Sequence, residues 1–204
     1  VHPAENQAYF MCEGFLRWIL SGREGADVLL DNLIINMVVM ANPDGNALGN
    51  YRTNSNGVNL EMEYAAPYNS EVAETKAIRQ QIESYMGTKE NPGQNPVRIL
   101  LNLHSAHGYS PPFHFVHRAN WPENGVTQSV RDAELKWVEA FRNRSEFVDM
   151  GRDSTSTLRT RAYIESMMHD RYSIHPDWDD VMAITIEGTY QTGPIEGVQN
   201  TDDD

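Results

Sequence analysis

VRILLNLH, the sequence of residues 97–104, is a short apolar run that ends in a histidine. Its length and its apolar side chains predict a buried β-strand that ends at His104. A second run, MAITIE at residues 182–187, predicts a strand that ends at Glu187. A third run, IINMVVM at residues 34–40, predicts another buried strand, and the turn-forming residues 42–45 stop it. We therefore expect a sheet with these three runs at its core.

Three other segments carry the signals of helices. Ala8–Leu20 and Thr127–Phe141 have apolar residues at helical spacing, so each would bury one face. Ser70–Met86 has acidic residues in its first turn, where the helix dipole favours them. Because strand and helix signals alternate along the chain, the sequence predicts an α/β fold with helices packed around a sheet.

Polar side chains at the ends of the predicted strands mark the place for a site. In open α/β sheets, loops at the carboxyl ends of strands bring distant residues together. We therefore expect His104, Glu187 and the loop around Arg52 to converge.

Length and composition limit the class of protein. The chain has 204 residues, enough for one substantial core, so we expect a single domain over residues 1–204. Its net charge of −13 argues against a nucleic-acid partner, because phosphate binding needs a basic face. We expect no membrane partner, because no apolar stretch approaches the ~20 residues that cross a bilayer. The only cysteine, Cys12, rules out an internal disulfide framework and leaves the compartment open, with a cytoplasmic one favoured.

Two histidines and one acidic residue are candidates for a catalytic zinc site. His2 and Glu5 are three positions apart, and His104 follows a predicted strand. Two His and one carboxylate, with a fourth position left to water, form a standard ligand set for zinc. Such a metal activates its water and polarises a carbonyl; Glu187 is the candidate general base and Arg52 the candidate oxyanion stabiliser. Spacing alone is weak evidence, because a chain with 7 histidines and 29 acidic residues offers many chance pairs.

Six short motifs, in order along the chain, resemble those of the zinc carboxypeptidase family (the metallocarboxypeptidases), and especially its cytosolic-carboxypeptidase-like branch. The motifs are Val1-His2-Pro3-Ala4-Glu5-Asn6, Ala41-Asn42-Pro43-Asp44-Gly45, Gly49-Asn50-Tyr51-Arg52 with Gly57-Val58-Asn59-Leu60, Ser70-Glu71 with Glu74-Thr75, Leu103-His104-Ser105, and Thr185-Ile186-Glu187. They extend from residue 1 to about residue 190, and their order and intervals make coincidence an insufficient explanation.

The resemblance implies an α/β/α sandwich with a mixed, mostly parallel sheet and one zinc ion. It also implies the site roles by position. His2, Glu5 and His104 would be the metal ligands, Glu187 the base, and Arg52 the residue that polarises the carbonyl. Asn59 stands where many members have an aspartate behind the first histidine ligand; a neutral acceptor would orient the imidazole but raise its basicity less.

The chain departs from the family where the family docks a substrate's terminal carboxylate. The family has Asn-Arg at two positions that here are Glu61 and Met62. A guanidinium–carboxylate contact contributes about 1.5–3 kcal/mol. Replacing it with a thioether beside an anion removes the attraction and adds repulsion, so Glu61 and Met62, with Asn59, are the candidate substrate-binding residues.

Three hypotheses explain this departure. The substrate's end is neutral or amine-bearing and Glu61 recognises it, or another basic residue supplies the dock, or the substrate-binding function has decayed. The candidate basic residues are Arg118, Arg159 and Arg161. The family's mobile substrate-contacting tyrosine has two candidates, Tyr163 and Tyr172, of which Tyr163 is slightly better placed.

The sequence thus predicts a zinc-dependent hydrolase of peptide (amide) bonds, of the carboxypeptidase type. The alternatives are an amidase or peptidoglycan-peptide hydrolase with altered terminal recognition, and a catalytically silent metal-binding or interaction domain. Because the family's fold has strands before its first zinc motif, we expect residues 1–204 to lack N-terminal strands of the full fold. The oligomeric state is not predicted.

Overall fold

The structure is a computed structural model of the chain. It describes residues 2–69, 71–106, 113–116, 127–143, 148–154, 163–173 and 181–189. The main helices are α1 (Gln7–Ile19), α2 (Glu24–Asn32), α3 (Pro43–Ala47), α4 (Ala73–Met86), α5 (Gln128–Arg142) and α6 (Ile164–Met168). Two further helical segments are the 3₁₀ helix η1 (Leu60–Met62) and the π-helix η3 (His169–Ser173). The strands are β1 (Ile99–Ala106), β2 (Phe113–Val116), β3 (Val148–Ser154) and β4 (Met182–Thr189).

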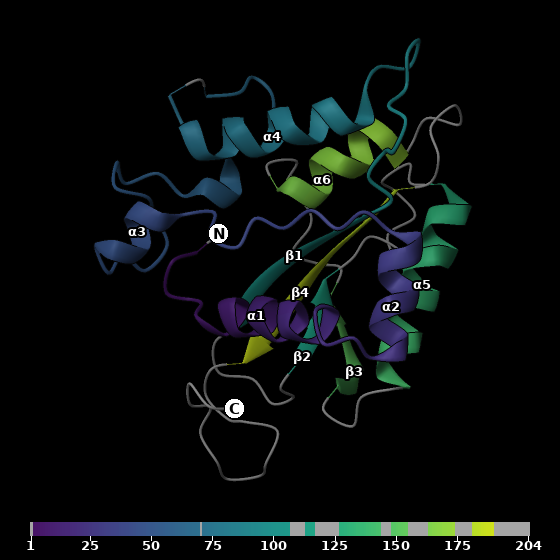
Figure 1. Cartoon of the computed structure of the whole chain (residues 1–204). Coiled ribbons are helices and arrows are strands. Elements are labelled where there is room, and N and C mark those ends of the chain that lie inside the picture. Colours follow the sequence, from purple (N-terminus) through teal and green to yellow (C-terminus); the bar gives the residue numbers. More distant parts are fainter. Residues whose placement is uncertain are drawn as a thin grey trace, which may run out of the picture.

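The four described strands form one mixed sheet in the order β1-β4-β2-β3 (Figure 1). β1 and β4 are parallel, and so are β2 and β3, whereas β2 and β4 are antiparallel. The pairing of β1 with β4 aligns Ile99 with Met182 and His104 with Glu187. Both predicted strands therefore exist, and their polar ends lie side by side.

Successive residues of β4 enter two different cores, because side chains alternate between the faces of a strand. Ala183 packs with Tyr64 and with residues of α4, α6 and η3. Ile184 and Ile186 pack with Val138 of α5, and Met11 of α1 lies against the same cluster. Helices therefore cover both faces of β4.

The three predicted helices are confirmed, with small shifts at their ends. Ala8–Leu20 corresponds to α1, Ser70–Met86 to α4 and Thr127–Phe141 to α5. Thr127 is the N-cap of α5, and its hydroxyl accepts a hydrogen bond from the Val130 N–H at 3.4 Å. Apolar spacing was enough to place α1 and α5, and the acidic first turn was enough to place α4.

The predicted strand at residues 34–40 is wrong for this structure. The segment has no regular strand among the described residues, and Ile34 and Val38 are 70% and 61% exposed. β-Branched residues favour a strand only where neighbours pair with it and cover it, and no described strand pairs with this segment. The turn after it is the start of α3, where the Asn42 side chain accepts a hydrogen bond from the Gly45 N–H at 3.0 Å.

Some expectations fall outside the described residues. They concern Arg118, Arg159 and Arg161. Among the helices that the structure describes, none combines the length and the apolar character needed to cross a membrane.

Candidate metal centre and catalytic site

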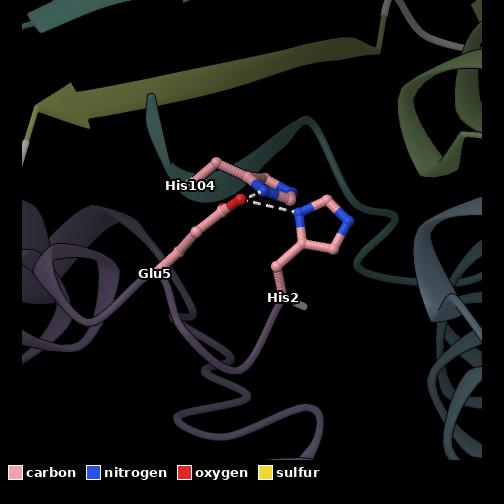
Figure 2. A group of neighbouring side chains, drawn as sticks. All are labelled: His2, Glu5 and His104. Atoms are coloured by element: carbon pink, nitrogen blue, oxygen red, sulfur yellow. Dashed lines mark hydrogen bonds and ion pairs between the residues drawn. The ribbon is translucent and has the colours of Figure 1, made fainter. Parts of the chain in front are cut away.

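His2, Glu5 and His104 form a compact buried cluster (Figure 2). His2 Nδ1 lies 2.8 Å from Glu5 Oε1, and His104 Nδ1 lies 2.6 Å from Glu5 Oε2. One ligand atom from each residue lies within 4.8 Å of the other two. The sequence-predicted ligands are thus brought together, although Glu5 and His104 are 99 residues apart in the chain.

A turn before α1 positions the first two of these side chains. The Glu5 N–H donates to the His2 carbonyl at 3.2 Å, which closes the turn. The Ser105 N–H on β1 donates to Glu5 Oε2 at 3.1 Å, so the carboxylate is tied to the strand that carries His104.

The loop that includes α3 holds this turn from the other side. Asn46 Nδ2 donates to the Pro3 carbonyl at 3.3 Å, and the Ala4 N–H donates to the Tyr51 carbonyl at 3.4 Å. Gly45 lies so close that a Cβ there would come within 2.8 Å of the Pro3 ring. The Asn-Pro-Asp-Gly sequence therefore matters for the site, because its glycine leaves room for the segment that carries His2 and Glu5.

Each imidazole has a second partner on its far side. His2 Nε2 lies 3.2 Å from Asn59 Oδ1, and His104 Nε2 lies 3.1 Å from Glu61 Oε2. Asn59 is also the N-cap of η1, because its Oδ1 accepts from the Glu61 N–H at 3.2 Å. One short segment thus supplies a contact to both histidines.

The surroundings of the cluster favour the ionised forms of Glu5, Glu61 and His104. Burial opposes ionisation of Glu5, but hydrogen bonds to His104 and His2 outweigh it and hold the pKa of Glu5 well below its ordinary value. Burial alone would lower the pKa of His104, yet Glu61 and Glu5 raise it to about 10. Glu61 is itself buried, but the charge of His104 keeps the pKa of Glu61 below its usual range.

These residues fit a zinc ion. Imidazole nitrogen and carboxylate oxygen are its ordinary donors, and both Nδ1 atoms face the same carboxylate. Glu5 and Glu61 also place two buried anions around His104, a charge that one divalent cation balances.

Glu187 lies next to the cluster. It is the register partner of His104 across β1 and β4. Burial raises the pKa of Glu187 to about 7; the charge of His104 acts against this rise, and Glu5 and Glu61 add to it. A carboxyl group with such a pKa is suited to accept and return protons near neutral pH.

Arg52 lies on an exposed loop, with its guanidinium carbon 5.9 Å from the centre of the Tyr51 ring. Its charge acts on Tyr163, as do the charges of Glu61 and Glu187. Tyr163 is half-buried, whereas Tyr172 is 3% exposed within the core. The structure therefore brings Tyr163, and not Tyr172, within the influence of the site.

Glu61 and Met62 lie in different environments although they are neighbours. Glu61 is 6% exposed, and Asn102 Nδ2 donates to its Oε1 at 3.1 Å. Met62 is 43% exposed.

Sequence reasoning missed two polar residues close to the site. Asn102 precedes His104 by two positions, so the alternation along a strand could have placed it on the same face. Glu165 of α6 is fully buried and accepts from the Thr185 hydroxyl at 2.5 Å. No signal in the sequence around Glu165 indicated this.

Comparisons with known proteins agree with the fold and the motifs. The cytosolic carboxypeptidase-like protein 5 of Mus musculus is 32% identical over 152 residues, which cover 65% of this chain and 17% of that protein. Its counterpart in Danio rerio is 43% identical over 68 residues, or 33% of this chain and 8% of that protein. A solved structure, a putative carboxypeptidase A from Shewanella denitrificans, matches with a TM-score of 0.75 at 18% identity over 97% of this chain and 50% of that one. No protein-family model matches the chain.

The chain spans 17% or less of these two curated relatives and half of the solved one. The structural match, at 18% identity, concerns the fold alone. The two relatives that share local sequence identity with this chain are both named cytosolic carboxypeptidase-like protein 5. These findings agree with the resemblance seen in the motifs: this chain is similar in local sequence to cytosolic carboxypeptidase-like proteins and similar in fold to a putative carboxypeptidase A.

Proposed function

We propose that this chain is the catalytic core of a zinc-dependent metallopeptidase of the carboxypeptidase type. The observation that carries the proposal is the buried cluster of His2, Glu5 and His104. Glu187 supports it, because this carboxyl group is paired in register with His104.

Each of these residues has a separate role in hydrolysis. His2, Glu5 and His104 hold the zinc ion, which when bound supplies a Lewis acid that activates water and polarises the carbonyl. Glu187 takes a proton from the attacking water and returns it to the leaving amine. Arg52 stabilises the negative charge that develops on the carbonyl oxygen.

We infer one catalytic domain over residues 1–204, folded as an α/β/α sandwich, since helices cover both faces of β4. Its substrate is a peptide, and the names of the similar proteins favour a cytoplasmic setting. Asn59 orients His2 through the 3.2 Å contact to its Nε2.

Hydrolysis of matched peptide pairs tests the proposal. One member of each pair has a free C-terminal carboxylate and the other an amide, and each is assayed with added zinc and with a chelator. Chelator-sensitive cleavage of the free acids supports a carboxypeptidase. Cleavage of the amidated peptides alone would replace it with an amidase, and cleavage of neither would reject catalysis on these substrates.

A single variant separates an enzyme from a silent metal-binding domain. Glu187→Gln replaces the carboxyl group with an amide, which cannot accept and return a proton, so kcat should fall by about 10²–10⁴-fold. Zinc bound per chain should not change, because Glu187 is not among the three clustered ligands.

A further inference from the structure

The carboxylate of Glu61 already has a partner at each oxygen. Oε1 accepts from Asn102 Nδ2 at 3.1 Å, and Oε2 lies 3.1 Å from His104 Nε2. The backbone of Glu61 is fixed as well, because its N–H donates to Asn59 Oδ1. Little of this carboxylate is open to a substrate group, because Glu61 is only 6% exposed.

The orientation of the His104 ring gives the contact with Glu61 a specific role. Its Nδ1 points at Glu5, on the side where the ligand atoms gather. An imidazole that binds a metal through Nδ1 carries its proton on Nε2, and that proton needs an acceptor. Glu61 is the acceptor, and it is an anion, which makes the imidazole a stronger donor to a cation.

The two histidine ligands therefore differ in their outer partners. His2 faces the neutral amide of Asn59, and His104 faces the carboxylate of Glu61. In many members of the family that this chain resembles, an aspartate stands at the position of Asn59, and the family has an asparagine at the position of Glu61. The chain keeps one acid and one amide, with their places exchanged.

We propose that Glu61 is a positioning residue for the metal ligand His104, and that the negative charge behind the ligands has moved from residue 59 to residue 61. The inference rests on the proposed function, since it assumes that the cluster binds zinc. It removes Glu61 from the substrate-binding residues and leaves the half-exposed Met62 to face the substrate at this point of the chain.

Zinc affinity, measured by competition with a chromophoric chelator, is the readout. Glu61→Gln keeps the size of the side chain and removes its charge, so zinc affinity should fall by about 10–100-fold. Asn59→Asp combined with Glu61→Gln returns the charge to residue 59 and should recover most of the loss. Glu63→Gln, the same change two positions away at a half-exposed residue, is the matched control and should leave the affinity unchanged.

Steady-state kinetics at saturating zinc give the second readout. A positioning role predicts that Glu61→Gln lowers kcat and leaves KM for a peptide nearly constant. Visible spectra of the cobalt-substituted proteins should shift in Glu61→Gln and return in the double variant. Circular dichroism in chelator checks that each variant is folded.

The outcomes separate the two proposals. Wild-type protein that binds no zinc overturns both. Wild-type protein that binds zinc, with Glu61→Gln unchanged in affinity and altered in KM, overturns the positioning role alone and restores Glu61 as a substrate contact. Loss of affinity without recovery in the double variant rejects the exchange of charge.

Discussion

Glu187 is subject to opposing influences from its surroundings. Burial, followed by the charges of Glu5 and Glu61, favours its neutral form, and the charge of His104 favours its ionised form. The net result raises its pKa to about 7. The residue thus holds its proton over much of the acidic range.

This pKa predicts how the reaction depends on pH. A general base must lose its proton before it can accept one, so kcat/KM should rise as pH rises through about 7. The profile of kcat/KM from pH 5 to 9, with zinc saturating, measures this. An acid limb centred near 4.3, the ordinary value for glutamic acid, would contradict the prediction.

Gly45 lies where no other residue has room. A Cβ there would collide with the Thr53 carbonyl oxygen and come within 2.6 Å of Asn42 Oδ1 and 2.8 Å of the Pro3 ring. Gly45→Ala should therefore lower stability by about 1–3 kcal/mol and, by displacing the segment next to His2, weaken zinc binding. Urea unfolding and chelator competition measure the two effects.

Gly14 on α1 provides the control for this substitution. A Cβ there would meet no atom within 4 Å, and the residue lies within a helix. Gly14→Ala should raise stability by about 0.5–1 kcal/mol and leave zinc affinity unchanged. Equal effects of the two substitutions would show that packing around Gly45 is not the cause.

At the level of single residues, the sequence predicted that His2, Glu5 and His104 act as a group, and the structure brings them together; no sequence pattern indicated the partners of Glu61. Motif order is enough to associate His2 and Glu5 with His104. The surroundings of Glu61 depend on Asn102 and His104, which are 41 and 43 residues away. Such contacts follow from how the strand and the loop meet, which no local pattern specifies.

Between elements, the contact of α6 with β4 contains a buried acid. Glu165 of α6 accepts from the Thr185 hydroxyl of β4. Burial, and then the negative charge of Glu61, raise the pKa of Glu165 above its ordinary value. The folded chain therefore holds a proton on Glu165 at pH values where the unfolded chain has released it.

Linkage gives the sign of the resulting effect on stability. Because the folded state binds the extra proton, the free energy of unfolding should fall as pH rises above about 4.3, the ordinary glutamate pKa, until the raised pKa is passed. Glu165→Gln should remove this part of the fall and be more stable than wild type above it. Urea unfolding across pH 5–8 measures the slopes, with Glu139→Gln on the exposed side of α5 as the control.

Helices and strands were predicted correctly where the sequence pattern lay within a single segment. The helices α1 and α5 follow from apolar spacing within one segment, and β1 and β4 from short apolar runs with a partner beside them. Residues 34–40 have the same apolar character but no described partner strand, so propensity alone did not make a strand. The sheet order, with β2 between β4 and β3, depends on contacts between distant segments.

At the scale of the whole molecule, β1 forms one end of the described sheet. Ile99 and Leu101 on this strand are 40% and 43% exposed. Among the described residues no strand pairs with the outer side of β1, and an end strand with exposed apolar side chains is a template for another chain.

This edge predicts self-association at high protein concentration. Leu101→Lys places a charge on the edge and should keep the sedimenting species at monomer mass over a concentration range in which the wild-type mass increases. Leu20→Lys makes the same change at a residue that is 72% exposed at the end of α1, and it should behave as wild type. Association that both variants abolish equally would indicate a general charge effect.

The separation of the ligands along the chain has a consequence beyond catalysis. Glu5 and His104 are 99 residues apart, so an ion held between them closes a loop of nearly half the polypeptide, as a reversible crosslink would. Such a crosslink exists only while the metal is supplied, because binding to the folded state alone stabilises it in proportion to the logarithm of free zinc. Zinc scarcity would then shorten the lifetime of the chain against proteolysis, in addition to stopping its chemistry.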